Sequence, residues 1–321
     1  MSALWAITCL FNPAGYRRRV ENYCWFRQRL AAPLVTVELS FTGEFALGRE
    51  DADILVQLDQ GDILFQKERL LNIALEHVPA GCEAVAWIDC DIVFGSNDWQ
   101  ERTLAALERF ALVQPFSERY DLLPDARPEV IVSWDKPYDR LSLMAKIAQD
   151  GLTAADFEQE RPPVGMPAWG LAWAARKEVL DRHGLYDACV FTSGDVAVFC
   201  AAIGVMKGRF VRRRMNDNSL RHYLEWARPF HETVRGSVGL VEGRLYHLWH
   251  GSLADRRYNT CLRELQDLGF DPFTDIVKTD QGTWRWSSDK PELHSHVREY
   301  FWSRNEDREP REGVPDEQVS T

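Results

Sequence analysis

The stretch of sequence that decides the fold spans Glu83–Phe94 and reads EAVAWIDCDIVF. Its first half is an apolar run of the kind found in strands that are covered on both faces. Two carboxylates one residue apart, Asp89 and Asp91, follow this run directly. Ligands in open α/β sheets bind at the carboxyl ends of strands, and hard divalent cations prefer oxygen ligands. The stretch therefore predicts a buried strand ending in a metal site, with two solvated acids at a loop start as the alternative.

Strand and helix patterns alternate on the N-terminal side of this stretch. Apolar runs predict strands at 4–10, 34–39 and 54–58, and amphipathic spacing predicts helices at 16–30 and across Leu70–Leu75. Parallel neighbouring strands need such crossover connections, which place helices on the faces of the sheet. We therefore expect an α/β protein with a mostly parallel sheet flanked by helices.

Composition and charge restrict the possible functions. The 321 residues are 45% hydrophobic and 27% charged, which is ordinary for a folded globular protein. The net charge of -11 disfavours broad binding to nucleic acids. Basic residues still cluster at Arg17–Arg19, Lys207–Arg214 and Arg256–Arg257, and such clusters are either phosphate sites or solvated faces.

The cysteines and the first residues bear on location. The seven cysteines show no paired metal-type spacing, and the N-terminal segment lacks a basic region followed by a long apolar stretch. No apolar run approaches the length needed to span a membrane. We therefore expect a cytoplasmic protein with free thiols and no membrane span.

Two segments carry a resemblance to a known family. Phe65–Asn72 reads FQKERLLN, and Trp87–Ile92 reads WIDCDI. Together they resemble the β-1,4-galactosyltransferase group of GT-A-fold glycosyltransferases, which implies a Rossmann-like GT-A sheet and a UDP-sugar donor. The resemblance implies that Phe65 stacks on the uracil and that Asp91 binds a manganese ion on the diphosphate. It implies that Asp89 contacts either the ribose or the groups that bind the metal directly. A core aromatic between strand and helix is the alternative for Phe65.

Two further blocks follow in the order that the family has. Pro167–Trp173 (PAWGLAW) looks like the family's strand under the acceptor site, and Phe191–Asp195 (FTSGD) is similar to its Trp-Gly-Gly-Glu-Asp run. The resemblance implies that Asp195 is the general base and that Phe191 stands at the donor-side Trp. Gly194 replaces the family's acceptor-contacting Glu. We therefore expect an acceptor other than N-acetylglucosamine.

The last block is Tyr246–Gly251, YHLWHG, at the end of an apolar run from Val238 that predicts a strand. It resembles the family's Met-x-x-His metal pair, with His247 in place of Met. Imidazole binds manganese-type metals readily, so His250 and His247 are expected to join Asp91 on Mn²⁺ or Mg²⁺. Arg256 follows within reach of a diphosphate, with a solvated helix start as the alternative.

The blocks suggest one domain. We expect residues 1–303 to form a single GT-A domain, with a nucleotide-binding half at about 1–115 and an acceptor half at about 116–303. The remaining residues, 304–321, are charged, contain proline and have almost no large apolar side chains, so they are expected to be a disordered tail.

These residues predict a chemistry. Sugar transfer needs charge stabilisation on the leaving diphosphate and a base for the acceptor hydroxyl. A divalent ion and Asp195 would supply both, which predicts a metal-dependent, inverting hexosyltransferase that uses a UDP-sugar. The alternatives are a catalytically idle module that binds a sugar nucleotide or glycan, and a metal-dependent nucleotidyltransferase or hydrolase. Residues 11–15, FNPAG, are a poor glycine-rich phosphate loop, which counts against a nucleotidyltransferase.

The acceptor hydroxyl remains open. The candidates are a glycan, a lipid-linked precursor, a small molecule, a protein and a modified nucleic-acid base. The basic residues Lys207, Arg209 and Arg212–Arg214 favour a phosphate-rich acceptor, whereas the net charge of -11 disfavours it. A local patch dominates only within a Debye length of about 8 Å.

Overall fold

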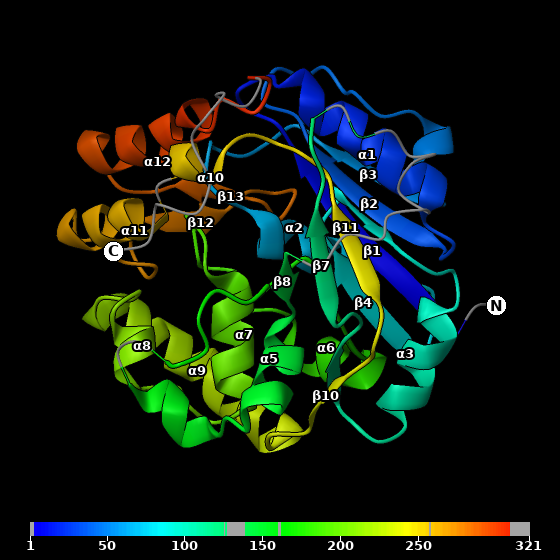
Figure 1. The fold of residues 1–321 in the computed structure, drawn as a ribbon. Coiled ribbons are helices and arrows are strands. Elements are labelled where there is room, and N and C mark those ends of the chain that lie inside the picture. Colours follow the sequence, from blue (N-terminus) through cyan, green and yellow to red (C-terminus); the bar gives the residue numbers. More distant parts are fainter. Residues whose placement is uncertain (1–2, 125, 127–138, 160–161, 257, 309–321) are drawn as a thin grey trace.

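A seven-stranded sheet forms the centre of the molecule (Figure 1). The computed structural model describes residues 3–124, 126, 139–159, 162–256 and 258–308. The strand order is β10-β6-β9-β4-β1-β2-β3. In chain order these strands are β1 (Leu4–Phe11), β2 (Leu34–Leu39), β3 (Ile54–Leu58), β4 (Ala84–Ile88), β6 (Leu112–Gln114), β9 (Ala172–Arg176) and β10 (Val238–Leu240).

Most neighbours in this sheet run parallel. β4, β1, β2 and β3 pair in parallel, as do β10 and β6, while β9 runs antiparallel between β4 and β6. The α/β class and the mostly parallel sheet expected from the sequence are confirmed, and the predicted strands at 4–10, 34–39 and 54–58 match β1, β2 and β3.

Helices cover both faces of the sheet, because alternate residues of its strands point to opposite sides. On one face, α1 (Arg17–Arg29) and α3 (Trp99–Leu107) share a core with β1 and β4. On the other face, α2 (Lys67–Glu76) and α6 (Lys177–His183) belong to the larger core. All five residues of β4 are buried, so the chain that leaves β4 emerges at the edge of a fully covered sheet.

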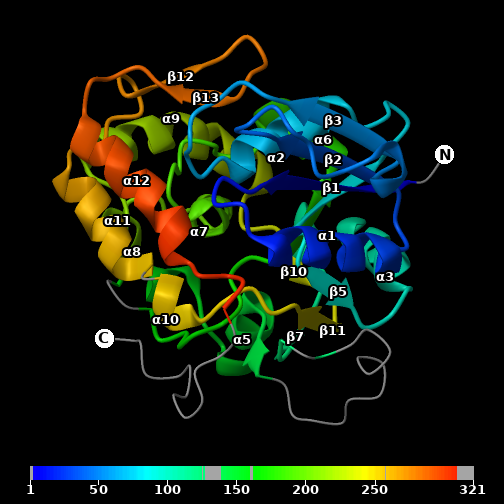
Figure 2. The same cartoon turned by 90° about the horizontal axis from the view of Figure 1, so that it is seen from above.

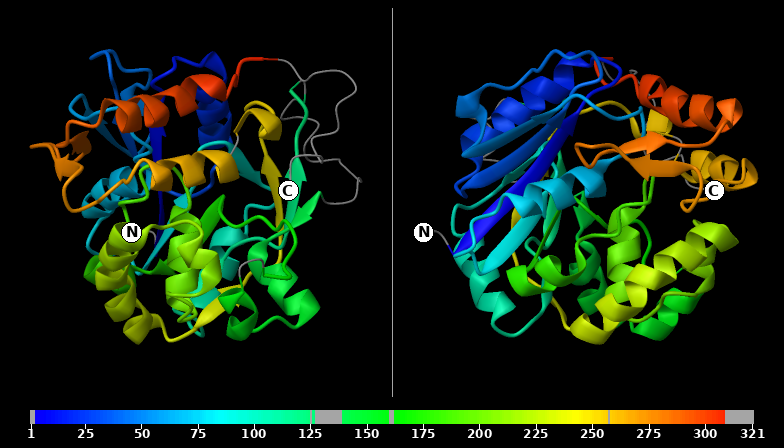
Figure 3. Two further views of the ribbon diagram at one scale, coloured as in Figure 1. Left: turned by 90° about the vertical axis from the view of Figure 1, so that its left-hand side faces the viewer. Right: turned by 180° about the vertical axis from the view of Figure 1, so that it is seen from behind.

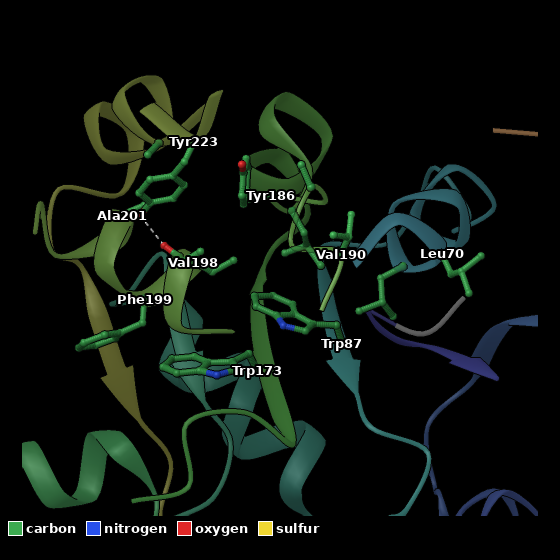
Figure 4. Close-up of a cluster of buried hydrophobic side chains, with 14 of the residues drawn as sticks. Leu70, Trp87, Trp173, Tyr186, Val190, Val198, Phe199, Ala201 and Tyr223 are labelled. Atoms are coloured by element: carbon green, nitrogen blue, oxygen red, sulfur yellow. Dashed lines mark hydrogen bonds between the residues drawn. The ribbon is translucent and has the colours of Figure 1, made fainter. Parts of the chain in front are cut away.

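The larger core continues into a group of helices from the second half of the chain (Figure 3). Trp87 of β4 pairs with Trp173 of β9, and Figure 4 shows the Trp173 indole between Trp87 and Phe199. Seven of the nine residues of α7 (Gly194–Ala202) are buried, and α7 packs against α9 (Asp217–Val234). This burial fixes the position of the first turn of α7.

A second, four-stranded sheet of order β5-β11-β7-β8 lies beside the first. The sequence predicted one strand from Val238 to the end of the histidine block, and this is wrong. β10 joins the large sheet and ends at Leu240, and β11 starts at Arg244 in the second sheet, because the polar Glu242-Gly243 step interrupts the apolar run. The strands of the second sheet are β5 (Ile92–Phe94), β7 (Glu118–Asp121), β8 (Arg140–Leu141) and β11 (Arg244–His247).

The remaining elements surround these two sheets. Figure 2 shows α12 running towards the N-terminal end of α1, and α11 packs beside α12. None of the described helices is long and apolar enough to cross a membrane. The seven cysteines are free thiols. The other elements are η1 (Arg49–Asp51), α5 (Leu143–Asp150), η2 (Ala154–Glu158), α8 (Arg209–Arg212), α10 (Leu253–Arg256), α11 (Tyr258–Asp267), β12 (Ile276–Lys278), β13 (Trp284–Trp286) and α12 (Pro291–Ser303).

The chain after α12 differs from the expected disordered tail. Residues 304–308 are part of the described structure, and Arg304 and Glu306 have exposed fractions of 5% and 0%. The boundary expected at residue 303 is therefore too early, because two charged side chains beyond it are buried by ion pairing instead of being solvated. Residues 309–321 lie outside the described residues.

Candidate metal and active site

The turn after β4 and the end of β11 come together at one edge of the two sheets. β5 follows Asp91 directly and pairs antiparallel with β11, with Ile92 opposite His247. The backbone N–H of Leu248 then donates to the Asp91 carbonyl at 2.8 Å. This pairing places the predicted carboxylate and the predicted histidine block side by side, although they are far apart in the sequence.

Asp91, His247 and His250 form a cluster whose ligand atoms all lie within 4.8 Å of one another. His250 Nε2 is 3.2 Å from Asp91 Oδ2 and 2.9 Å from His247 Nε2. Both imidazoles are buried, with exposed fractions of 6% for His247 and 7% for His250. The three side chains predicted to share one ion are therefore close enough to do so.

The Nε2 atoms of the two imidazoles face each other at 2.9 Å. His247 Nδ1 lies 2.9 Å from Asp121 Oδ1 and 3.1 Å from Arg119 Nη2. Arg256 Nη2 lies 3.0 Å from His250 Nε2. The buried Asp91 Oδ1 has no hydrogen-bond partner among the described residues. A cation between these atoms would bind both Nε2 atoms and this oxygen.

Burial and nearby charge keep the ligands in their metal-binding forms. Burial, together with the cation of Arg256, lowers the pKa of His250 to about 3. Burial and Arg119 also lower the pKa of His247. Burial alone would raise the pKa of Asp121, but the hydrogen bond from His247 and the charge of Arg119 hold it well below the usual range. Near neutral pH the cluster therefore offers two neutral imidazoles, one of them oriented by a carboxylate.

This donor set fits Mn²⁺ or Mg²⁺ with a phosphate ligand, since it combines a carboxylate with two imidazoles and leaves positions for other oxygens. Among the described residues, the other comparably close group comprises Cys261, Glu264 and His296. Its imidazole is already engaged, because His296 Nε2 faces the Cys261 carbonyl at 3.1 Å and Nδ1 lies 3.6 Å from Glu264. The first cluster differs from this group because its Asp91 Oδ1 is buried and has no hydrogen-bond partner among the described residues.

Lys67, at the start of α2, links the two other predicted acids. Its Nζ lies 2.6 Å from Asp89 Oδ1 and 3.1 Å from Asp195 Oδ2. Burial would lower the pKa of Lys67, but Asp195 and Asp89 outweigh it and raise that pKa well above its usual value. The structure thus brings Asp89 and Asp195 to one cation. Sequence reasoning quoted Lys67 within its block and gave it no role.

Glycines let these acids approach the backbone closely. A Cβ on Gly194 would overlap the carboxylate of Glu68, and a Cβ on Gly170 would overlap that of Asp195. Next to these glycines, Ser193 and Leu171 have positive φ angles of 83° and 75°, which are uncommon for residues with side chains. Such strain costs about 1–3 kcal/mol per residue and gathers at functional sites.

Glu68 is a buried acid that the sequence did not single out. Burial raises the pKa of Glu68 to about 8, with Lys67 opposing and Asp195 adding to the increase. Burial likewise raises the pKa of Asp89 to about 6, again against the charge of Lys67. Glu68 therefore carries a proton in the folded protein at pH values where the unfolded chain has lost it.

This difference gives a stability prediction. Between about pH 4.5 and 8 the folded protein binds one more proton at Glu68, so its free energy of unfolding falls as pH rises. Glu68→Gln is neutral at every pH and should remove on the order of 3 kcal/mol of the fall between pH 5.5 and 8.5, since one pKa unit corresponds to about 1.4 kcal/mol. Urea unfolding at pH 5.5 and 8.5 measures it, with exposed Glu108→Gln as the control. Equal pH slopes in wild type and Glu68→Gln would contradict this.

The remaining predicted residues have mixed outcomes. Phe191 lies in the core with an exposed fraction of 1%, where its ring packs on His296 and Tyr300. Residues of α12 cover the ring in this arrangement, and the expected donor contact of Phe191 stays a prediction. Phe65 is partly exposed and meets Phe11 edge-on at 5.6 Å, so uracil stacking stays a prediction. Arg256 is buried against His250 instead of forming a solvated helix start.

The basic segment before α9 borders a cavity of about 570 Å³ on the surface of the helical group. Its charged lining includes Lys207, Arg212, Arg221 and Arg228, together with Asp217 and Glu225. Arg214, also in the predicted basic run, instead covers the ring of Phe210 at 3.8 Å. The basic run therefore contributes only part of its charge to this cavity.

Comparisons with known proteins find solved structures of low similarity. No family model and no curated protein sequence matches the chain. Among solved structures, S. aureus TarS 1-349 in complex with UDP-GlcNAc is 10% identical, covers 94% of this chain and 72% of that chain, and has a TM-score of 0.37. A putative nucleotide-diphospho-sugar transferase from Desulfovibrio desulfuricans G20 is 12% identical over 94% of this chain and 99% of that chain, with a TM-score of 0.34.

A nucleotidyltransferase-type structure is also similar. The 4-diphosphocytidyl-2C-methyl-D-erythritol synthase from Anaerococcus prevotii DSM 20548 is 11% identical, covers 75% of this chain and 88% of that chain, and has a TM-score of 0.33. At these values the likeness carries no argument about fold or activity.

Proposed function

We propose that this protein is a metal-dependent, inverting glycosyltransferase that moves a sugar from a UDP-sugar to an acceptor hydroxyl. The observation that carries the proposal is the meeting of Asp91, His247 and His250 at the carboxyl end of β4, with one carboxylate oxygen unpartnered. Lys67 places a second acidic pair, Asp89 and Asp195, beside this edge. Ligands of open α/β sheets bind at such an edge.

Each group has a role in this proposal. Asp91 and the two imidazoles hold the ion, and the bound ion supplies Lewis-acid stabilisation of charge on the diphosphate. Arg256, already beside His250, adds positive charge next to the leaving group. Asp89 contacts the ribose, and the partly exposed edge of Phe65 receives the uracil.

Asp195 accepts the proton of the acceptor hydroxyl. Its side chain is 21% exposed, whereas Lys67, which holds it, is only 12% exposed. The acceptor can therefore reach the carboxylate, while the lysine fixes its direction. One base opposite the leaving group implies inversion at the sugar carbon.

The acceptor remains a hydroxyl of a glycan, lipid-linked precursor, small molecule or modified nucleic-acid base. Position 194, next to Asp195 in the sequence, contributes no side chain because it is a glycine. The Glu68 carboxyl packs against the Gly194 backbone. The cytoplasmic location expected from the sequence remains part of this proposal.

A nucleotidyltransferase is the less favoured candidate. Such enzymes cradle phosphates on free backbone N–H groups after the first strand. Here the Asn12 side chain closes that loop on itself, because Oδ1 accepts from Tyr16 N at 2.9 Å and Nδ2 donates to the Tyr16 carbonyl at 2.7 Å. In the loop after β1, the Asn12 side chain and the Tyr16 backbone are therefore hydrogen-bonded to each other.

The test incubates the protein with Mn²⁺ and a panel of UDP-, GDP- and CMP-sugars, and follows slow hydrolysis of the donor by chromatography of the released nucleotide. Release of UDP from at least one UDP-sugar, lost on adding EDTA, is the expected result. Pyrophosphate release from a nucleoside triphosphate and a sugar phosphate would identify a nucleotidyltransferase. UDP-sugar binding without any turnover, even with a broad set of acceptors, would leave only an idle binding module.

A further inference from the structure

The segment after α12 crosses the metal cluster and ends on the first helix of the chain. Figure 2 shows the end of α12 approaching α1. Tyr16 Oη donates to the Trp302 carbonyl at 2.8 Å and accepts from Asn305 N at 3.0 Å. Asp307 then caps α1, because its two carboxylate oxygens accept from Arg17 N and Arg18 N at 3.0 and 2.8 Å. We call residues 304–307 the strap.

The strap packs against Gly251, the residue that follows His250. Gly251 has a φ of 89°, and a Cβ there would lie 2.7 Å from the Arg304 carbonyl and 3.2 Å from Glu306 Cα. Only a glycine allows both this backbone conformation and this close approach. The strap and the histidine block therefore form one packed unit.

Glu306 is the one fully buried carboxylate in the strap, with an exposed fraction of 0%. Arg19 holds both of its oxygens, with Nη2 donating to Oε1 at 2.8 Å and Nε lying 2.7 Å from Oε2. Arg304 also pairs with Oε1. A buried carboxylate is costly unless it is paired and hydrogen-bonded, so these contacts fix its position closely.

Glu306 faces the side of His250 that points away from the cluster. Glu306 Oε1 is 3.9 Å from His250 Nδ1, while His250 Nε2 faces Asp91 and His247. A metal-bound imidazole usually donates its other N–H to a carboxylate, which fixes the ring and strengthens the ligand. Asp121 already does this for His247 at 2.9 Å.

We propose that Glu306 is a positioning residue for the metal ligand His250, and that the strap completes the metal site from the far end of the chain. The inference rests on the proposed metal site. In the structure Arg304 Nη2 lies 3.3 Å from His250 Nδ1, closer than Glu306 Oε1. When the ion binds Nε2, the proton of His250 lies on Nδ1, so Glu306 replaces Arg304 as the partner of that atom and accepts from it, in the way that Asp121 accepts from His247. Arg19 and Arg304 keep Glu306 in place as an anion.

Mn²⁺ alone is the probe, and the free ion is counted by electron paramagnetic resonance on the full chain. Glu306→Gln is expected to raise the Kd for Mn²⁺ by about 10- to 100-fold, the usual effect of losing such a supporting carboxylate. Glu306→Asp should recover part of the affinity. Glu299→Gln is the matched control, because Glu299 lies on the exposed side of α12 and accepts from Ser295 Oγ at 2.8 Å, and the Kd of this variant should stay at the wild-type value.

Glu306→Gln leaves two arginines facing an uncharged amide, so this variant has a folding risk. The double variant Arg304→Gln, Glu306→Gln keeps the net charge and should show the same loss of affinity. Circular dichroism in EDTA verifies that both are folded. Wild-type Kd in either folded variant would overturn the role of Glu306 while leaving the metal site and the proposed function in place. Absence of Mn²⁺ binding by the wild type would overturn both together.

Discussion

Replacing Asp195 by Asn is expected to lower kcat by about 10²- to 10⁴-fold, the usual contribution of a positioned base. The amide keeps the shape of the side chain but cannot take the acceptor proton. Lys67 retains Asp89 as a partner, so the start of α2 should stay in place. The dissociation constant for UDP in Mn²⁺ should therefore change by less than about threefold, on the order of 0.6 kcal/mol.

Asp181→Asn is the matched control for this experiment. Asp181 also pairs with a lysine, Lys177, at 2.7 Å, but it lies on α6 with a half-exposed side chain. Its kcat should equal that of the wild type. Wild-type turnover in Asp195→Asn, with intact UDP binding, would remove Asp195 as the base and leave the donor site standing.

Replacing His250 by Ala is expected to abolish metal-dependent UDP binding with little effect on folding. His250 touches both other ligands, at 3.2 Å to Asp91 and 2.9 Å to His247, so its loss divides the cluster. His247→Ala should weaken binding less, because Asp91 and His250 remain together. Calorimetry with UDP, GDP and CMP, each with and without Mn²⁺, is the measurement, and UDP should rank first only when the metal is present.

His294→Ala provides the control for the loss of an imidazole. His294 stacks on Trp286 of the β12–β13 hairpin at 4.3 Å and belongs to no metal cluster among the described residues. It should bind UDP like the wild type. If His250→Ala kept metal-dependent UDP binding, the shared-ion arrangement would be refuted, even though the side chains lie close together.

The parts of the fold that were predictable are those encoded locally. The apolar run before Asp89 is buried on both faces, and strands with this pattern were located to within a residue. The break within the Val238 run was missed, because two strands that enter different sheets are separated only by a short polar step. The hydrophobicity of a segment indicates that it is buried, but it does not indicate which strands it pairs with.

The site residues were predictable where they belong to the sequence segments that resemble the family. Asp91, His247 and His250 do meet, as the order of the blocks suggested. Their supporting groups come from places without any local signal. Asp121 is the last residue of a short strand of the second sheet, and Glu306 lies in a charged segment with the composition of a disordered tail. Pairing between distant charges decides these positions, and a single sequence does not display it.

The contact between Arg19 and Glu306 has a consequence for how the chain matures. The two residues are separated by 287 positions, so all of the chain between them must be made before they can meet. Synthesis proceeds from the N-terminus at about 5–20 residues per second, so α1 is exposed well before Glu306 leaves the ribosome. A growing chain can thus build its large sheet while His250 still lacks its distant support. In this proposal the metal site is complete only after Glu306 has been synthesised and has paired with Arg19 of α1.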